Sequence, residues 1–98
     1  MKMKNGYVPS ILETWEGEDF FYNYIINTQT VRHEIFFGTG NRKISKANGF
    51  WVNVTPNVHK MIHENRDLDL ALKCLCQRKY EETHTRDDFM RLIGRNYL

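Results

Sequence analysis

The chain has 98 residues, the size of one domain, and no apolar run in it approaches the roughly 20 residues that span a membrane. Its formal net charge is +2, but residues 1–30 carry two bases and four acids, whereas residues 31–98 carry twelve bases and eight acids. This mild basic excess permits nucleic-acid contact without requiring it, and a mixed solvated surface accounts for it equally well.

Residues 1–20 are predicted to form a lead-in segment. Residues 1–6 include two lysines but are followed by no apolar stretch, so a secretory signal is not expected and the predicted compartment is the cytoplasm. The acidic stretch from Glu13 to Asp19 is interpreted as an exposed loop. An alternative is that it meets a basic channel of a partner protein.

Three short strands and a polar loop are predicted next. Residues 20–27 are aromatic and β-branched, which favours a strand or a tight knuckle, and residues 31–37 read as a second strand. Residues 38–49 contain three glycines around a polar run and are predicted to be a loop. Residues 50–54 are rich in β-forming residues and predict a third strand.

A short helix is predicted to open at Thr55 and Pro56, because proline is tolerated in the first helical turn. This helix would carry Val58, His59 and Met61. Because the predicted strands are followed by this helix and two further helices, the predicted fold class is α+β.

The main helix is predicted from Asp67 to Glu82. Its apolar residues recur at spacings of three and four and form one stripe: Leu68, Ala71, Leu72, Leu75 and Lys79 or Tyr80. Cys74 and Cys76 point about 200° apart on this helix, so they are not expected to share a metal or a disulfide. They are interpreted as small core or flank residues in a reducing compartment.

The last helix is predicted from its termini. Thr85 and Asp88 resemble a capping box, with Asp where Glu is usual, and Gly94 is a plausible stop. Its buried face is predicted to be Phe89, Leu92 and Ile93.

Three of the four histidines lie on the second predicted strand and on the short helix that follows the third. His59 and His63 share one face of the short helix as an i, i+4 pair, which can chelate one divalent ion. His33, on the second predicted strand, can serve as a general base. A single histidine is more often structural than chemical, and His84 is interpreted as structural or exposed.

Several segments of the chain resemble, in the same order, small phage-encoded endonucleases of the HNH family. The matching residues are 31–43 (VRHEIFFGTGNRK), Ser45, Gly49, Trp51, 76–82 (CQRKYEE), Thr85, Arg86 and 94–98 (GRNYL). The resemblance is clear from about Val31 to Leu98 and weaker before that. It implies a ββα-metal, treble-clef-like fold with a β-hairpin and C-terminal helices.

The same resemblance implies one domain, with a lead-in over residues 1–20, a ββα-metal core over 21–66 and C-terminal helices over 67–98. It also implies a phage-type protein that acts on DNA in the cytoplasm of the host cell.

The resemblance assigns roles to individual residues. It implies that His33 is the general base that activates the attacking water, that Asn41 organises the site and that His59 binds the catalytic ion. His63 and Asn65 match a later His-x-Asn pair near the metal. Two alternatives stay open: Asn41 is a simple turn residue, and Asn65 caps the main helix.

The predicted ion and its surroundings follow from the same residues. The ligands are rich in imidazole, which suits Mn, Ni or Zn better than Mg, so Mn²⁺ or Ni²⁺ is expected to support activity well, with Mg²⁺ as a further candidate. Arg42, Lys43 and Lys46 could hold the phosphate backbone of DNA, although a solvated loop explains them as well.

The chain departs from the family at its structural zinc site. The family's two cysteine pairs would fall near Phe21 and Tyr24 and at Thr55 and Val58, and none of these residues is a strong zinc ligand. No structural zinc is therefore expected. We hypothesise that Phe21, Tyr24 and Val58 replace it with a small apolar cluster.

Two functions stay open. The retained histidines favour a metal-dependent HNH-like DNA endonuclease. Arg32, which stands where many HNH proteins have a metal ligand, and the short segment from His59 to His63 favour an inactive HNH-like phage protein. Such a protein would inhibit a host defence protein or sequester nucleic acid or a nucleotide. A structural accessory in a phage replication module is a third alternative. DNA is the expected partner and a host or phage protein is an alternative partner, whereas the sequence does not identify an oligomer interface.

Overall fold

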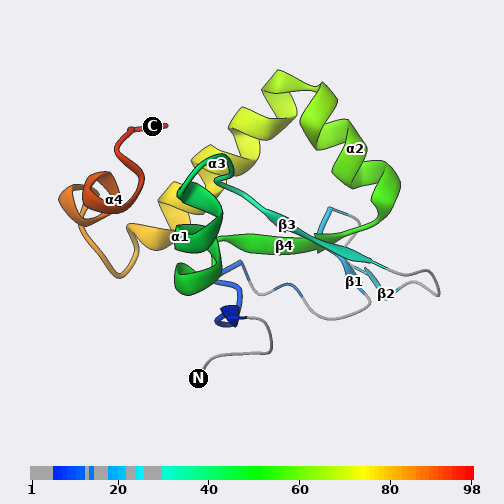
Figure 1. The fold of residues 1–98 in the computed structure, drawn as a ribbon, viewed down its shortest axis with the longest axis horizontal. Coiled ribbons are helices and arrows are strands. Elements are labelled where there is room, and N and C mark those ends of the chain that lie inside the picture. The colour runs from blue at the N-terminus through cyan, green and yellow to red at the C-terminus, as the bar shows by residue number, and fades with distance from the viewer. Residues whose placement is uncertain (1–5, 13, 15–17, 22–23, 26–29) are drawn as a thin grey trace.

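The computed structural model describes residues 6–12, 14, 18–21, 24–25 and 30–98, and the predicted α+β class is confirmed (Figure 1). The elements in chain order are β1 (Glu18–Asp19), β2 (Tyr24–Ile25), β3 (Val31–Glu34), α1 (Asn41–Asn48), β4 (Trp51–Val54), α2 (Pro56–Glu64), α3 (Arg66–Tyr80) and α4 (Arg86–Ile93). None of the helices in this part of the chain is long and apolar enough to cross a membrane.

The antiparallel pair β3–β4 lies at the centre of the fold, with α2 and α3 on one side of it (Figure 1). Its register sets His33 opposite Val52 and Glu34 opposite Trp51. All four residues of β4 are buried, because other elements cover both faces of this strand. β3 ends at Glu34, three residues earlier than predicted, where the chain bends into the core.

Residues 41–48, predicted to be a loop, form helix α1 instead. Gly40 before it (φ 83°) and Gly49 after it (φ 75°) adopt backbone conformations that favour glycine. Ser45 fastens the helix to the core, since its hydroxyl accepts from the Phe36 N–H at 3.2 Å and donates to the Phe36 carbonyl at 2.6 Å. The prediction failed because the segment is polar and no side chain caps its start.

The short helix predicted at Thr55 is confirmed as α2, and the Thr55 hydroxyl accepts from the Val58 N–H at 3.3 Å. Asn65 separates α2 from α3. Its side-chain oxygen accepts from the Leu68 N–H at 3.1 Å, which confirms the interpretation of Asn65 as a helix cap.

The main helix is confirmed within two residues at each end, but its buried face differs from the prediction. Leu72 and Tyr80 lie in the core as expected, whereas Leu75 is 42% exposed. Cys76, a free thiol, takes the place between them, so the buried face follows a spacing of four residues. The interpretation of Cys76 as a small core residue is confirmed.

The predicted capping box of α4 is confirmed. The Thr85 hydroxyl accepts from the Asp88 N–H at 3.1 Å, and the Asp88 carboxylate accepts from the Thr85 N–H at 3.2 Å. Gly94 (φ 80°) ends the helix as expected. The predicted apolar face contributes one buried and two half-buried residues, Phe89, Leu92 and Ile93.

The hairpin β1–β2 is joined to β4 and to the start of α2 by hydrogen bonds. The Phe20 N–H donates to the Asn53 carbonyl at 2.9 Å, and the buried carboxylate of Asp19 accepts from the Thr55 N–H at 2.9 Å. The interpretation of the acidic stretch as an exposed loop is therefore wrong for Asp19, which has a structural role. Glu13 and residues 15–17 lie outside the described residues.

The apolar cluster predicted in place of zinc is not formed as expected. Val58 is buried in the main core, but Phe21 is 40% exposed. Phe20 packs against the core instead. The side chain of Tyr24 lies outside the described residues.

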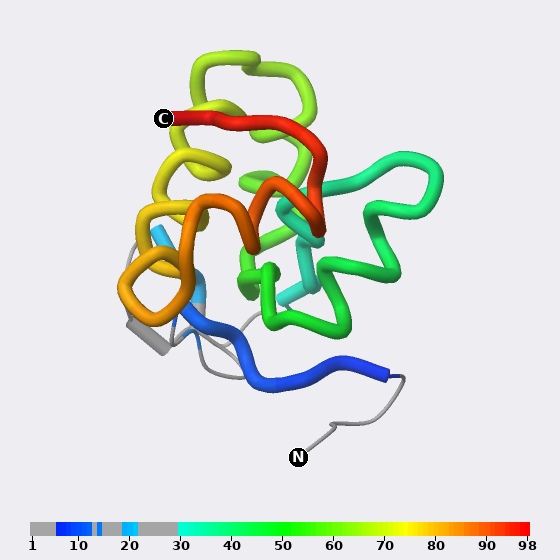
Figure 2. Tube along the Cα trace, turned by 90° about the vertical axis from the view of Figure 1, so that its left-hand side faces the viewer, coloured from blue at the N-terminus to red at the C-terminus, as the bar shows by residue number. Residues whose placement is uncertain are grey.

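Segments from both ends of the chain lie against the core (Figure 2). Residues 6–12 run beside α1, where the Ile11 N–H donates to the Gly49 carbonyl at 3.0 Å. At the other end, the Tyr97 N–H donates to the side-chain oxygen of Gln77 in α3 at 2.7 Å.

Candidate metal centre

The structure brings together the three histidines singled out in the sequence. One ring nitrogen from each of His33, His59 and His63 lies within 4.8 Å of the others. The Nε2 atoms of His59 and His63 are 3.2 Å apart. We call these three residues the histidine cluster.

Two elements position the cluster. Val58 and Ile62 bury one face of α2 in the core, and His59 and His63 each follow by one residue, so both imidazoles lie at the edge of that face. α2 packs against β3, which carries His33. The cluster therefore depends on the docking of a helix to a strand more than 20 residues away in the sequence.

The cluster lines a hollow of about 110 Å³, which we call the histidine hollow. Glu34, Phe37 and Arg42 complete its lining. Burial is graded across it: His33 is only 1% exposed, His59 is half-buried and His63 is exposed. Solvent thus reaches the cluster from the side of His63.

The environment keeps two of these imidazoles neutral at pH 7. Burial, with a smaller effect from the nearby His59, His63 and Lys73, lowers the pKa of His33 from 6.5 to about 3. Burial and the neighbouring His63 also lower the pKa of His59. A neutral imidazole has a nitrogen lone pair that can bind an ion or accept a proton.

The donor set fits a divalent ion. Two nitrogens that share an ion at bonds of about 2.1 Å lie about 3.4 Å apart in tetrahedral geometry and at most about 4.2 Å apart in any geometry. The 3.2 Å separation of the His59 and His63 Nε2 atoms meets this condition directly. In addition, the buried Nε2 of His33 has no hydrogen-bond partner among the described residues.

Asn41 is the first residue of α1 and does not belong to the lining of the hollow. Its backbone N–H donates to the Gly38 carbonyl at 3.2 Å, and its side-chain amide lies 3.5 Å from the Phe37 carbonyl. These contacts agree with the alternative interpretation of Asn41 as a turn residue. A role in organising the site stays a prediction.

The three bases predicted to hold phosphate occupy different surroundings. Arg42 lines the histidine hollow, whereas Lys43 is exposed and outside its lining. The ammonium of Lys46 lies 5.1 Å from the centre of the Tyr7 ring. Arg42 is therefore the base best placed to meet a ligand of the cluster.

Arg32, at the position of a family metal ligand, is engaged elsewhere. Its guanidinium lies 4.6 Å from the centre of the Tyr7 ring and 4.9 Å from that of Trp51. These cation–π contacts hold the N-terminal segment against β4. Arg32 thus belongs to the scaffold beside the cluster.

Glu34 is the site residue that the sequence did not reveal. Strict strand alternation would send its side chain away from that of His33, yet it lines the hollow at the end of β3. Its negative charge favours the protonated form of His59. The only signal in the sequence was a carboxylate directly after a candidate histidine.

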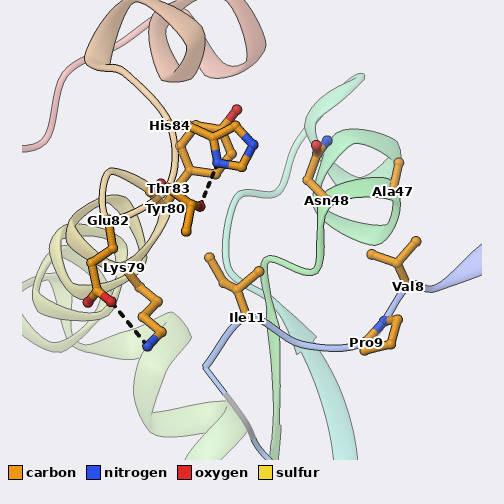
Figure 3. Close-up of a pocket in the computed structure, with 10 residues that line it drawn as sticks. All are labelled: Val8, Pro9, Ile11, Ala47, Asn48, Lys79, Tyr80, Glu82, Thr83 and His84. Carbon is orange, nitrogen blue, oxygen red and sulfur yellow. Dashed lines mark hydrogen bonds and ion pairs between the residues drawn. The ribbon is translucent and has the colours of Figure 1, made fainter. Parts of the chain in front are cut away.

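A larger hollow of about 430 Å³ lies between the N-terminal segment and the C-terminal ends of α1 and α3 (Figure 3). His84 is on its wall, with its ring stacked on Tyr80 at 4.1 Å and its Nδ1 2.8 Å from the Thr83 hydroxyl. These contacts support the interpretation of His84 as a structural or exposed residue.

Comparisons of the chain with protein-family models, with curated proteins and with solved structures give no match. The resemblance to HNH nucleases therefore stays a hypothesis that rests on the residues named above.

Proposed function

We propose that this chain is a metal-dependent hydrolase of DNA phosphodiesters, a phage-type nuclease with an HNH-like ββα-metal core. The observation that carries the proposal is the meeting of His33, His59 and His63 in a solvent-accessible hollow that Arg42 also lines. The antiparallel pair β3–β4, followed directly by the helix that carries two of the ligands, supports the proposed core.

The residues have complementary roles in this proposal. His59 and His63 hold a divalent ion, which when bound offsets negative charge on the phosphate and on the leaving oxygen. Arg42, at the rim, donates hydrogen bonds to a phosphate oxygen. His33 is neutral at pH 7 and completes the cluster, either as a proton acceptor or as a ligand.

A plasmid assay tests the proposal. Supercoiled DNA is incubated with the wild-type protein and Mg²⁺, Mn²⁺ or Ni²⁺, alongside His59→Ala and the matched control His84→Ala. We expect metal-dependent nicking that His84→Ala keeps and that His59→Ala reduces by about 100-fold or more, within the range of positioned catalytic groups. Folded wild-type protein that cuts with none of these ions contradicts the proposal.

A second candidate is an HNH-like protein that binds nucleic acid or a host defence protein without cutting. The burial of His33 favours it, because a substrate cannot touch a side chain that is 1% exposed unless the site opens. A DNA mobility shift without any nicking would support this candidate.

A further inference from the structure

We propose that His33 is the third ligand of a three-histidine site for a late first-row divalent ion such as Zn²⁺, Ni²⁺ or Co²⁺, and not a general base. The inference rests on the proposed function only in that the same site would serve hydrolysis. It concerns the number and kind of the ligands, which can be measured without any substrate.

The first argument is the state of the His33 nitrogen. Its Nε2 is buried and meets no hydrogen-bond partner among the described residues, although buried polar atoms are nearly always partnered. A general base would face the water that it activates, and this side chain is 1% exposed. A cation held inside the cluster would satisfy that lone pair without opening the site.

The second argument is geometric. The ring centres are 4.8 Å apart for His59 and His63, 5.2 Å for His33 and His59, and 5.3 Å for His33 and His63, so the rings form a nearly equilateral triangle. The ligand nitrogens lie within 4.8 Å of one another, and those on one tetrahedral ion lie about 3.4 Å apart, so a shift of up to about 1.4 Å completes the site. His63 is exposed and can make that shift.

The third argument is chemical. The group of ligating side chains that the described residues bring together contains three imidazoles and no carboxylate. Such a set follows the general order of affinity in which Co²⁺, Ni²⁺ and Zn²⁺ bind more tightly than Mn²⁺, and it suits Mg²⁺ poorly. Three protein ligands also leave a coordination position open, as catalytic sites require, and here it would face the hollow beside Arg42.

A Co²⁺ titration of the whole metal-free chain, followed by visible absorption and by competition with a chelator, tests the inference. We expect one ion per chain. His33→Ala should weaken its binding by about 100-fold and change the absorption bands, whereas His84→Ala should leave both unchanged. A His33→Ala protein that binds Co²⁺ with wild-type affinity and spectrum overturns the inference.

A second measurement needs no substitution and so avoids a variant that fails to fold. In the proton NMR spectrum of the wild-type Co²⁺ complex, each ligating imidazole gives a strongly shifted, exchangeable N–H signal. Three such signals are expected. Two signals, or no Co²⁺ binding at millimolar concentration, overturn the inference.

The two proposals fail separately. A Co²⁺ complex with three imidazole signals, combined with no nicking of plasmid, supports the three-histidine site and contradicts the proposed nuclease activity. Nicking by the wild-type protein, combined with a two-imidazole complex that His33→Ala leaves intact, supports the nuclease and returns His33 to the role of a base.

Discussion

At the scale of single residues, His33 is an imidazole held in surroundings that disfavour its charged form. Burial is the main cause, and the nearby His59, His63 and Lys73 disfavour that charged form further. The same surroundings would favour an uncharged ligand or an uncharged base. They also make the stability of the metal-free protein depend on pH.

The folded pKa of His33 is about 3 and its ordinary value is 6.5, so between these values the unfolded chain binds a proton that the folded chain does not. The contribution of the neutral His33 to stability is therefore fully present above about pH 6.5 and is lost as the pH falls towards 3. We expect this group to cost up to about 1.4 kcal/mol per pH unit in that window. Urea unfolding at pH 7, 6 and 5 in the presence of a chelator measures it.

His33→Gln is the matched variant for this pH series, since it removes the titrating group and keeps a polar side chain of similar size. Its unfolding free energy should fall less steeply between pH 7 and pH 5, with a residual slope from His59, whose pKa is lowered in the same direction. Identical slopes for the two proteins would show that His33 is not held neutral.

Arg42 and Lys43 are neighbours in sequence, but only Arg42 lines the histidine hollow. Under the proposed function, Arg42→Ala should reduce plasmid cutting about tenfold, because a hydrogen bond to a charged group contributes about 1.5–3 kcal/mol. Lys43→Ala should change the rate less than about twofold. Equal losses in the two variants would mean that the loss comes from general charge and not from a phosphate site.

At the scale of the elements, glycines flank helix α1 and Ser45 anchors it to the core. Gly49, which ends the helix, also contacts the N-terminal segment. A methyl group added at Gly49 would overlap the Pro9 carbonyl oxygen, and its φ of 75° is unfavourable for any other residue. Gly94 ends α4 with a similar φ of 80°, but nothing lies within 4 Å of an added methyl group there.

These two glycines form a matched pair for a stability test. Gly94→Ala should cost about 1 kcal/mol, the strain of the left-handed conformation alone. Gly49→Ala should cost clearly more, because residues 6–12 must also move away from α1. Urea unfolding of both variants measures the difference, and equal losses would contradict the close packing at Gly49.

The hairpin β1–β2 is held against the rest of the fold by a hydrogen bond and by apolar packing. The Asp19 carboxylate accepts from the Thr55 N–H at 2.9 Å. A hydrogen bond of this kind, to a charged group, contributes about 1.5–3 kcal/mol, and Phe20 adds apolar packing against the core.

At the scale of the whole molecule, one aromatic core joins α4 to segments of the chain from Phe36 onward. Phe89 of α4 is fully buried, and its ring centre lies 5.5 Å from that of Phe36, 6.2 Å from Phe50 and 5.9 Å from Tyr80. These partners come from the segment after β3, from the residue before β4 and from α3. Loss of this one ring therefore weakens contacts across most of the fold.

Phe89→Ala should lower the free energy of unfolding by about 3–5 kcal/mol, the usual range for a buried phenylalanine in a core. Met90→Ala, one residue further on the exposed side of α4, should change it by less than about 0.5 kcal/mol. Chemical denaturation followed by fluorescence and by circular dichroism should give coincident transitions for the wild type. A small loss in Phe89→Ala would mean that α4 is not integral to the core.

Short-range features of the chain were predictable from the sequence. The Thr85–Asp88 capping box, the opening of α2 at Thr55 and the i, i+4 pair of His59 and His63 each depend on residues within about one helical turn. Neighbouring residues determine such features, because their backbone hydrogen bonds and side-chain spacing need no distant partner.

Features that depend on contacts between distant segments were decided only by the tertiary structure. Helix α1 is anchored by the bonds between Ser45 and Phe36, and Cys76 displaces Leu75 from the buried face of α3. The sequence by itself determined the α+β class and the identity of the three histidines. The burial of His33 and its place within 4.8 Å of the other two arise only when α2 docks on β3, because burial and distance belong to the packed chain and not to any one segment.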